Sequence, residues 1–217
     1  WFCKMSHPLV VKNLGEKPYV KVWQTMKSFT DSRGECVTDE IWFVQHPPVY
    51  TLGQAGKVEH LLKPSDIPVV HSDRGGQVTY HGPGQLVCYL LLDVRRLPFG
   101  VRGLVTAIEQ SIIQLINSYG VTAESKPEAP GVYVDGKKLA ALGLRIRKGC
   151  SYHGLGLNVD MDLGPFSNIN PCGFKGLEVT DMKGLGIDRP MTEIMEELTD
   201  ILIRQIGYDD ALTLRTL

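Results

Sequence analysis

The chain has 217 residues, of which 43% are hydrophobic and 22% charged, a composition typical of a soluble globular domain with a full core. Its formal net charge of -1 indicates no nucleic-acid partner and no anionic membrane surface, and no apolar run reaches the roughly 18 residues that cross a bilayer. We expect one domain over residues 1–217, with residues 1–8 as a disordered or vector-derived start.

An odd number of cysteines without a C-x-x-C pair argues against a disulfide framework or a zinc site. We therefore expect free thiols and a reduced, cytoplasmic protein. The five cysteines are Cys3, Cys36, Cys88, Cys150 and Cys172.

Apolar periodicity in the first half of the chain predicts one helix among short strands. Tyr19, Val22, Trp23, Met26 and Phe29 recur at helical spacing, and the helix should end between residues 31 and 35. Strands are expected at 9–11 (an edge strand), 41–44, 49–52, 67–70 and 86–94, the last buried on both faces.

The second half predicts two more amphipathic helices, at 104–119 and 191–206, each followed by a glycine. Asp135-Gly136 is typical of a hairpin turn between strands at 132–134 and 137–146, and a further strand is expected at 152–159. Residues 160–186 show no regular pattern. Because strands and long helices do not alternate regularly, the expected fold class is α+β with a mixed or antiparallel sheet.

A glycine-rich segment at 72–85 is the first candidate for ligand binding. Gly75, Gly76, Gly82 and Gly84 would let a ligand approach the backbone closely, although the spacing matches neither a Walker loop nor G-x-G-x-x-G. A purely structural loop is an equally simple interpretation. Its many hydrogen-bonding side chains favour a binding loop: Arg74, Gln77, Thr79, Tyr80 and His81.

Cys172 is the candidate nucleophile, because the turn Asn170-Pro171-Cys172-Gly173 would hold its thiol out of the packed interior. Cys150 is kept in reserve. His153 and His81 could each partner a thiol, but a packed or surface histidine is the simpler interpretation. No G-x-S-x-G elbow indicates a serine hydrolase, and no H-x-x-x-H pair indicates a metal site.

Lys138 is the one charge on a strand face shared with Ala140, Leu142, Leu144 and Ile146, if the strand alternates regularly. Such a lysine usually extends to water. In the alternative, it lies at the mouth of an apolar pocket, where burial would lower its pKa and its charge would favour a thiolate. Spacing alone favours the solvated lysine.

Four segments together resemble the LipB family of octanoyl-acyl-carrier-protein:protein N-octanoyltransferases. They are residues 74–85, 136–143, 153–158 and 170–173, and the likeness extends over about residues 9–207. The resemblance implies the mixed sheet flanked by helices of biotin and lipoate protein ligases. It also implies that an octanoyl group moves from acyl carrier protein to a lysine of a lipoyl domain, the first step of endogenous protein lipoylation.

The same resemblance implies roles for individual residues. Cys172 would carry the acyl group as a thioester, Lys138 would act as acid and base, and His153 and Asn158 would support them. The acyl-binding residues would be Arg74, Gly75, Gly76, Gln77, Val78, Thr79, Tyr80, His81, Ala141, Leu142, Gly143, Gly154, Leu155 and Gly156. No cofactor or metal is expected, because the phosphopantetheine of acyl carrier protein supplies the acyl group.

The expected partners are octanoyl-acyl carrier protein as donor, and lipoyl domains of 2-oxoacid dehydrogenase complexes and glycine cleavage H protein as acceptors. Acyl carrier proteins are acidic, so a local basic patch is expected. Its candidates are Arg74, Arg95, Arg96, Arg102, Arg145 and Arg147.

Three other functions remain open. An ATP-dependent lipoate or biotin ligase of the same fold would activate a free acid and would not need Cys172. A non-catalytic module could bind acyl carrier or lipoyl domains without turnover. A thiol hydrolase would release free octanoate.

Overall fold

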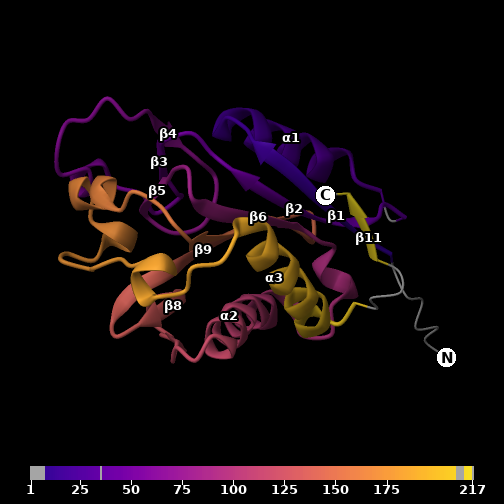
Figure 1. Ribbon diagram of the computed structural model, residues 1–217. Coiled ribbons are helices and arrows are strands. Elements are labelled where there is room, and N and C mark those ends of the chain that lie inside the picture. The colour runs from indigo at the N-terminus through magenta and orange to yellow at the C-terminus, as the bar shows by residue number, and fades with distance from the viewer. Residues whose placement is uncertain (1–7, 35, 209–212, 217) are drawn as a thin grey trace.

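The structure is a computed structural model that describes residues 8–34, 36–208 and 213–216 (Figure 1). Residues 1–7, which include Cys3, and Glu35 lie outside the described residues. The strands form a large mixed sheet in the order β11-β1-β2-β6-β10-β9-β8-β7 and a small sheet in the order β4-β3-β5.

The large sheet comprises β1 (Leu9–Glu16), β2 (Asp39–Gln45), β6 (Gln85–Leu91), β7 (Glu124–Ser125), β8 (Gly131–Val134), β9 (Lys137–Arg147), β10 (Cys150–Asn158) and β11 (Thr213–Thr216). The small sheet comprises β3 (Val49–Leu52), β4 (Val69–His71) and β5 (Val78–His81). The three α-helices are α1 (Tyr19–Ser32), α2 (Gly100–Ser118) and α3 (Met191–Ile206).

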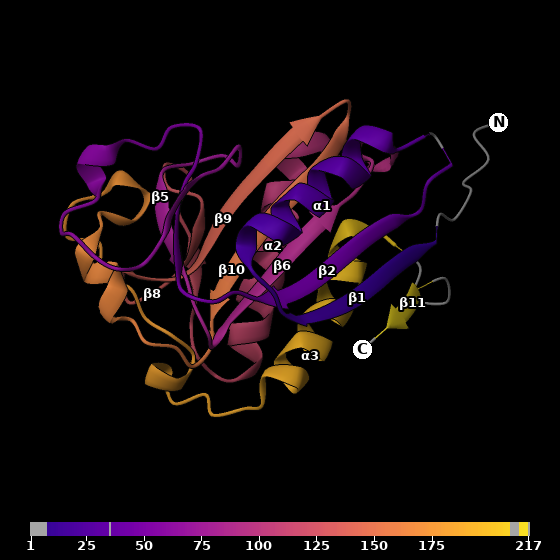
Figure 2. The ribbon, with the colours of Figure 1, turned by 90° about the horizontal axis from the view of Figure 1, so that it is seen from above.

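Helices cover both faces of the large sheet. Helix α1 lies across one face, whereas α2 and α3 lie together on the other (Figures 1 and 2). The alternation of β6 explains this arrangement, since Val87, Tyr89 and Leu91 pack with α1 while Cys88 and Leu90 pack with α2 and α3. Every residue of β6 is buried, as its apolar sequence predicts.

The predicted α+β class and all three helices are confirmed. Strand β1 is not an edge strand, because β11 pairs with it in parallel on its outer side. Strand β4 begins two residues later than predicted, and β7 and β11 were not predicted at all. The glycine-rich segment contains a strand, β5, because Val78 and Tyr80 pack into the core of the small sheet.

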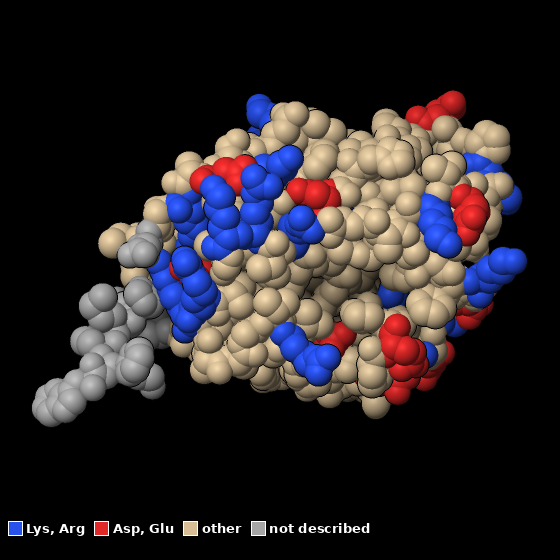
Figure 3. Space-filling model, turned by 180° about the vertical axis from the view of Figure 1, so that it is seen from behind, with Lys and Arg blue, Asp and Glu red and all other residues tan. Residues whose placement is uncertain are grey.

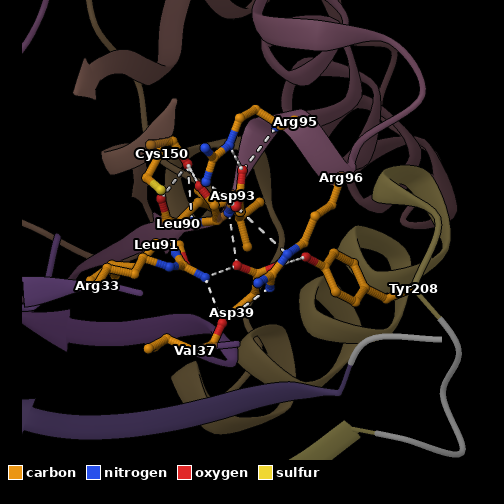
Figure 4. Close-up of polar contacts among 12 residues, drawn as sticks. Arg33, Val37, Asp39, Leu90, Leu91, Asp93, Arg95, Arg96, Cys150 and Tyr208 are labelled. Carbon is orange, nitrogen blue, oxygen red and sulfur yellow. Dashed lines mark hydrogen bonds and ion pairs between the residues drawn. The ribbon is translucent and has the colours of Figure 1, made fainter. Parts of the chain in front are cut away.

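A buried ionic cluster centred on Asp39 joins distant parts of the chain (Figure 4). The carboxylate accepts hydrogen bonds from the guanidinium groups of Arg33 and Arg96, from the hydroxyl of Tyr208 and from the backbone N–H of Asp93. Asp39 is fully buried. The cluster therefore links the end of α1, the start of β2, the turn after β6 and the segment after α3.

None of the helices in the described part of the chain is long and apolar enough to cross a membrane.

Candidate active site

Cys172 lies on a tight turn in a backbone conformation that few residues adopt. Its φ of 56° and ψ of 16° are left-handed, as is the φ of 81° of Gly173. The N–H of Gly173 donates to the carbonyl of Asn170 at 2.9 Å, and the N–H of Asn170 donates to the carbonyl of His60 at 2.9 Å. The turn thus holds a half-buried thiol in one position.

Lys138 lies beside this thiol, although 34 residues separate the two in sequence. Its Nζ lies 2.8 Å from the Sγ of Cys172 and 3.3 Å from the carbonyl oxygen of Pro130, and 5.1 Å from the ring centroid of Tyr133. Lys138 is only 3% exposed, so its charge is not directed to water as spacing alone suggested. Burial of a lysine requires such partners.

Two opposing influences set the pKa of Lys138. Burial lowers it, but the charge of the Cys172 thiolate and its hydrogen bond, together with the hydrogen bond and charge of Tyr133, outweigh burial, so the pKa is raised. The prediction of a lowered Lys138 pKa is therefore wrong for the enzyme without an acyl group on Cys172. That prediction considered burial without the adjacent anion.

A β-bulge changes the side of the strand on which Lys138 lies. Val132 pairs with Ala140, but the next residue, Tyr133, pairs with Lys138, so β9 has one extra residue here. Lys138 consequently lines a small pocket together with Ala141, whereas Ala140 packs in the core under the sheet. The predicted apolar face shared with Lys138 is wrong, because the extra residue breaks strict alternation.

A cavity of about 470 Å³ lies next to the thiol. It includes most of the binding residues expected from the sequence, namely Arg74, Gly75, Gly76, Gln77, Val78, Thr79, His81, Ala141, Leu142, Gly143, His153, Gly154, Leu155 and Gly156, together with Cys172. Gly156 pairs with Ala141, and Gly154 with Gly143, so small residues of β9 and β10 lie together at the cavity.

The glycine-rich segment crosses over β9 at Gly143. The N–H of Gly75 donates to the carbonyl of Leu144 at 2.9 Å, and a Cβ on Gly143 would stand 2.9 Å from the carbonyl oxygen of Gly75. Gly143 thus permits a close backbone approach. Because the Gly75 N–H already donates to the carbonyl of Leu144, it cannot also donate to the oxyanion that forms when a thioester is attacked.

Arg74 holds the glycine-rich segment in shape. Its guanidinium donates to Oγ1 and the carbonyl of Thr51 and to the carbonyls of Gly75 and Gln77. Burial lowers its pKa. A side chain bound to its own backbone in this way is not available to dock a partner.

His153 and Tyr152 both contact Asp73, although they are neighbours in a strand. The carboxylate accepts hydrogen bonds from Nε2 of His153 at 2.9 Å, from the hydroxyl of Tyr152 and from Nε1 of Trp23 at 2.7 Å. Both rings can reach it because His153 adopts a φ of 60°. Burial alone would raise the pKa of Asp73. These hydrogen bonds together have the larger effect, so the pKa is lowered below its usual value.

Some predicted residues lie elsewhere. Tyr80 packs its ring against Tyr50 and Phe166 in the core of the small sheet. Asn158 lines the small pocket beside Cys172, and its Nδ2 donates to the carbonyl of Thr180 at 2.9 Å. Cys150, the reserve nucleophile, is buried beside Asp93, and burial raises its pKa.

Several cavity residues were missed by sequence reasoning. They are Tyr19, Gln85, Val87, Tyr89, Val101, Val105, Glu128, Ala129, Pro130 and Phe174. Most belong to helices or strands whose apolar pattern indicates only core packing, and the loop at Pro130 carries no recognisable signal. Asp73 was likewise missed as a partner for His153. Among the described residues, no group of three or more His, Cys, Asp or Glu could hold a metal ion.

The sequence of this chain matches the family described as "Lipoyl protein ligase A/B catalytic domain" over residues 18–207. The chain belongs to this family. It is 59% identical over 210 residues to an octanoyltransferase of Pseudomonas fluorescens (strain SBW25), covering 97% of this chain and 98% of the relative. It is 58% identical to an octanoyltransferase of Cellvibrio japonicus, covering 93% and 94%. The predicted resemblance, and an enzyme of the octanoyltransferase class, are therefore confirmed.

Solved structures show the same fold at low sequence identity. A lipoate-protein ligase A bound with ATP superposes with a TM-score of 0.75 at 14% identity, covering 94% of this chain and 87% of that one. A biotin protein ligase from Aquifex aeolicus in complex with biotin and ATP gives 0.57 at 11% identity, covering 91% and 69%. The predicted biotin and lipoate ligase fold is confirmed.

Proposed function

We propose that this enzyme transfers an octanoyl group from acyl carrier protein to the lysine ε-amine of a lipoyl domain through a thioester on Cys172. The observation that carries the proposal is the 2.8 Å contact between a buried lysine and a thiol at the wall of an acyl-sized cavity. An ammonium beside a thiol stabilises the thiolate, which is the reactive nucleophile.

In the first half-reaction, the Cys172 thiolate attacks the thioester carbonyl of the donor. The new Cys172–acyl bond forms as the bond to the phosphopantetheine sulfur breaks, and the Lys138 ammonium gives that sulfur its proton. One thioester replaces another, so the step requires neither ATP nor a cofactor.

Acylation changes the environment of Lys138 in the direction that the second half-reaction needs. The thiolate charge and its hydrogen bond, which raise the pKa of Lys138, are lost when the sulfur becomes a thioester. Burial, which lowers the pKa, then prevails and favours the neutral amine. Lys138 can now accept a proton from the incoming lysine amine as that amine attacks the thioester, and Cys172 leaves as a thiolate.

Burial and existing ion pairs reduce the number of candidate arginines that could dock an acidic carrier protein. Arg74 is buried, and Arg96 pairs with Asp39 and Asp93 with its side chain only 12% exposed. Arg95 and Arg147 are 60% and 46% exposed, and each also has an acidic partner. Lys and Arg side chains gather on the back of the molecule, close to a hollow in the surface (Figure 3).

The test is to mix the protein with octanoyl-acyl carrier protein without ATP and to measure its intact mass. We expect one octanoyl adduct on the wild-type protein and on Cys150→Ser, but none on Cys172→Ser. Addition of a lipoyl domain should then move the adduct to that domain.

Each other outcome would refute the proposal in favour of a stated alternative. Labelling that requires free octanoate and ATP would indicate a ligase. Binding of either partner without any adduct or turnover would indicate a non-catalytic module. Release of free octanoate faster than octanoyl-lipoyl domain would indicate a hydrolase.

A further inference from the structure

The cavity beside Cys172 has one open side and one buried end. Val101 and Phe174, on the open side, are 42% and 45% exposed. Tyr89 and His153, at the other side, are 3% and 1% exposed. A donor attached to a carrier protein must extend through the open side, so only a group that terminates, such as an acyl tail, fits the buried end.

The floor of the cavity leads from the thiol to His153. Cys172 and Ala141 line the same small pocket, and Ala141 pairs with Gly156 on β10. His153 is three residues from Gly156 along the same strand, a distance of about 10 Å at roughly 3.3 Å per residue. An extended octanoyl chain is about 9 Å long, since each carbon–carbon bond of about 1.5 Å advances it by about 1.25 Å.

His153 lines this cavity, and one of its ring nitrogens is buried without a hydrogen-bond partner among the described residues. Its Nε2 donates to the carboxylate of Asp73, and its Nδ1 is buried with no hydrogen bond. Burial lowers the pKa of His153, although Asp73 opposes the shift, so the ring is neutral and Nδ1 is an acceptor.

Asp73 also fixes the position of the ring. The carboxylate is held in turn by Tyr152 and Trp23, and the ring of Tyr152 stacks on that of His153 with centroids 5.0 Å apart. The imidazole therefore cannot easily turn aside to admit a longer chain.

We propose that His153, held by Asp73, forms the distal end of the acyl site and limits the acyl group to about eight carbons. A longer chain would meet the volume of the fixed ring. This inference rests on the proposed thioester on Cys172. It makes His153 a specificity-determining residue rather than a partner of the thiol.

The experiment is a single-turnover competition among equimolar hexanoyl-, octanoyl-, decanoyl- and dodecanoyl-acyl carrier protein, with the adducts on Cys172 resolved by intact mass. In His153→Ala, the ratio of decanoyl to octanoyl adduct should rise at least about tenfold, because the volume of the imidazole ring becomes available to the longer chain. In His153→Gln, which keeps a polar side chain of similar size, the ratio should stay close to that of the wild-type protein.

A ratio unchanged in folded His153→Ala, or raised equally in both variants, would overturn the proposal. If His153→Ala does not fold, Gly156→Ala supplies a second test, since its methyl would stand on the cavity floor 3.1 Å from Oε1 of Gln85. Octanoylation of Gly156→Ala should slow at least about tenfold, while alkylation of Cys172 by the small reagent iodoacetamide should not. Equal rates of octanoylation in Gly156→Ala and wild type would contradict the proposed path.

The two proposals fail in different ways. No adduct on the wild-type protein with any donor would refute the Cys172 thioester itself. A normal octanoyl adduct whose chain-length ratio does not respond to His153→Ala would refute only the role of His153.

Discussion

Lys138 and Cys172 form a pair in which the charge on the thiolate raises the pKa of the lysine. The lysine is buried among Pro130, Tyr133 and the thiol, and no acidic side chain hydrogen-bonds to its Nζ among the described residues. Its ammonium is therefore sustained mainly by the thiolate, with a smaller contribution from the side chain of Tyr133. In the proposed mechanism, this dependence lets one side chain act as an acid in one half-reaction and as a base in the other.

Replacement of Lys138 by methionine keeps a side chain of similar length without the charge. We expect Lys138→Met to lower octanoyl transfer by about 10²–10⁴-fold, because both the thiolate and the proton transfer lose their support. Alkylation of Cys172 by iodoacetamide at pH 7 should slow as well. Transfer is followed by the mass of the lipoyl domain, and alkylation by the mass of the enzyme.

Lys137 provides the matched control for this substitution. It precedes Lys138 directly, but its side chain is 47% exposed and pairs with Glu178 on the surface. Lys137→Met should transfer octanoate like the wild-type protein. Equal impairment of both variants, or unaltered alkylation in Lys138→Met, would show that the buried lysine does not activate the thiol.

At the level of elements, periodicity predicted where helices and strands lie but not where their regularity breaks. The apolar patterns of α1, α2, α3 and β6 are long, so their packing follows from the sequence. The bulge opposite Val132 and the left-handed His153 each redirect a functional side chain, and neither has a local signal. The proximity of Lys138 and Cys172 was implied by family resemblance, because only tertiary contacts bring the two residues together.

The turn that carries the thiol depends on two successive left-handed residues. Gly173→Ala would impose a Cβ on a φ of 81° and place it 3.2 Å from Cγ of Gln77. We expect a loss of about 1–2 kcal/mol in the free energy of unfolding, and octanoyl transfer slowed about tenfold or more as the thiol leaves Lys138. Urea unfolding and single-turnover acylation measure the two effects.

Gly176→Ala separates the general cost of a left-handed alanine from the effect on the thiol. Gly176 has a φ of 72° and no heavy atom within 4 Å of the added Cβ. This variant should lose similar stability but keep its acylation rate. If acylation fell equally in both variants, the position of the Cys172 turn would not explain the loss.

At the scale of the whole molecule, the Asp39 cluster joins the end of α1 and the segment after α3 to the sheet (Figure 4). Asp39→Asn keeps the shape but removes the counter-charge of the buried Arg33 side chain, whereas Arg96 keeps its ion pair with Asp93. We expect the free energy of unfolding to fall by about 3–5 kcal/mol, because an uncompensated buried charge remains. Asp31→Asn, which removes a surface pair with Arg147 that is 38% and 46% exposed, should cost under about 1 kcal/mol. Similar losses in both variants on urea unfolding would contradict this role for the cluster.

Buried histidines should make the whole fold sensitive to mild acid. Burial lowers the pKa of His46 to about 4, partly opposed by the carbonyl of Lys17, and burial with neighbouring charges lowers that of His81 to about 3. In the unfolded chain both histidines titrate near about 6.5, so below that pH the unfolded state binds more protons than the folded state. Stability is therefore complete above about pH 7 and is lost as the pH falls toward about 4.

Between pH 7.5 and 5, each of these two histidines should remove on the order of 2 kcal/mol from the free energy of unfolding. Carboxylates contribute little in this range, because their unfolded pKa values lie near about 4. Urea unfolding at a series of pH values measures the slope, and His46→Gln should make it shallower by the share of His46, about 2 kcal/mol over this range, since His81 and His153 remain. A slope that is flat in the wild-type protein, or unchanged in His46→Gln, would show that His46 is not held neutral by burial.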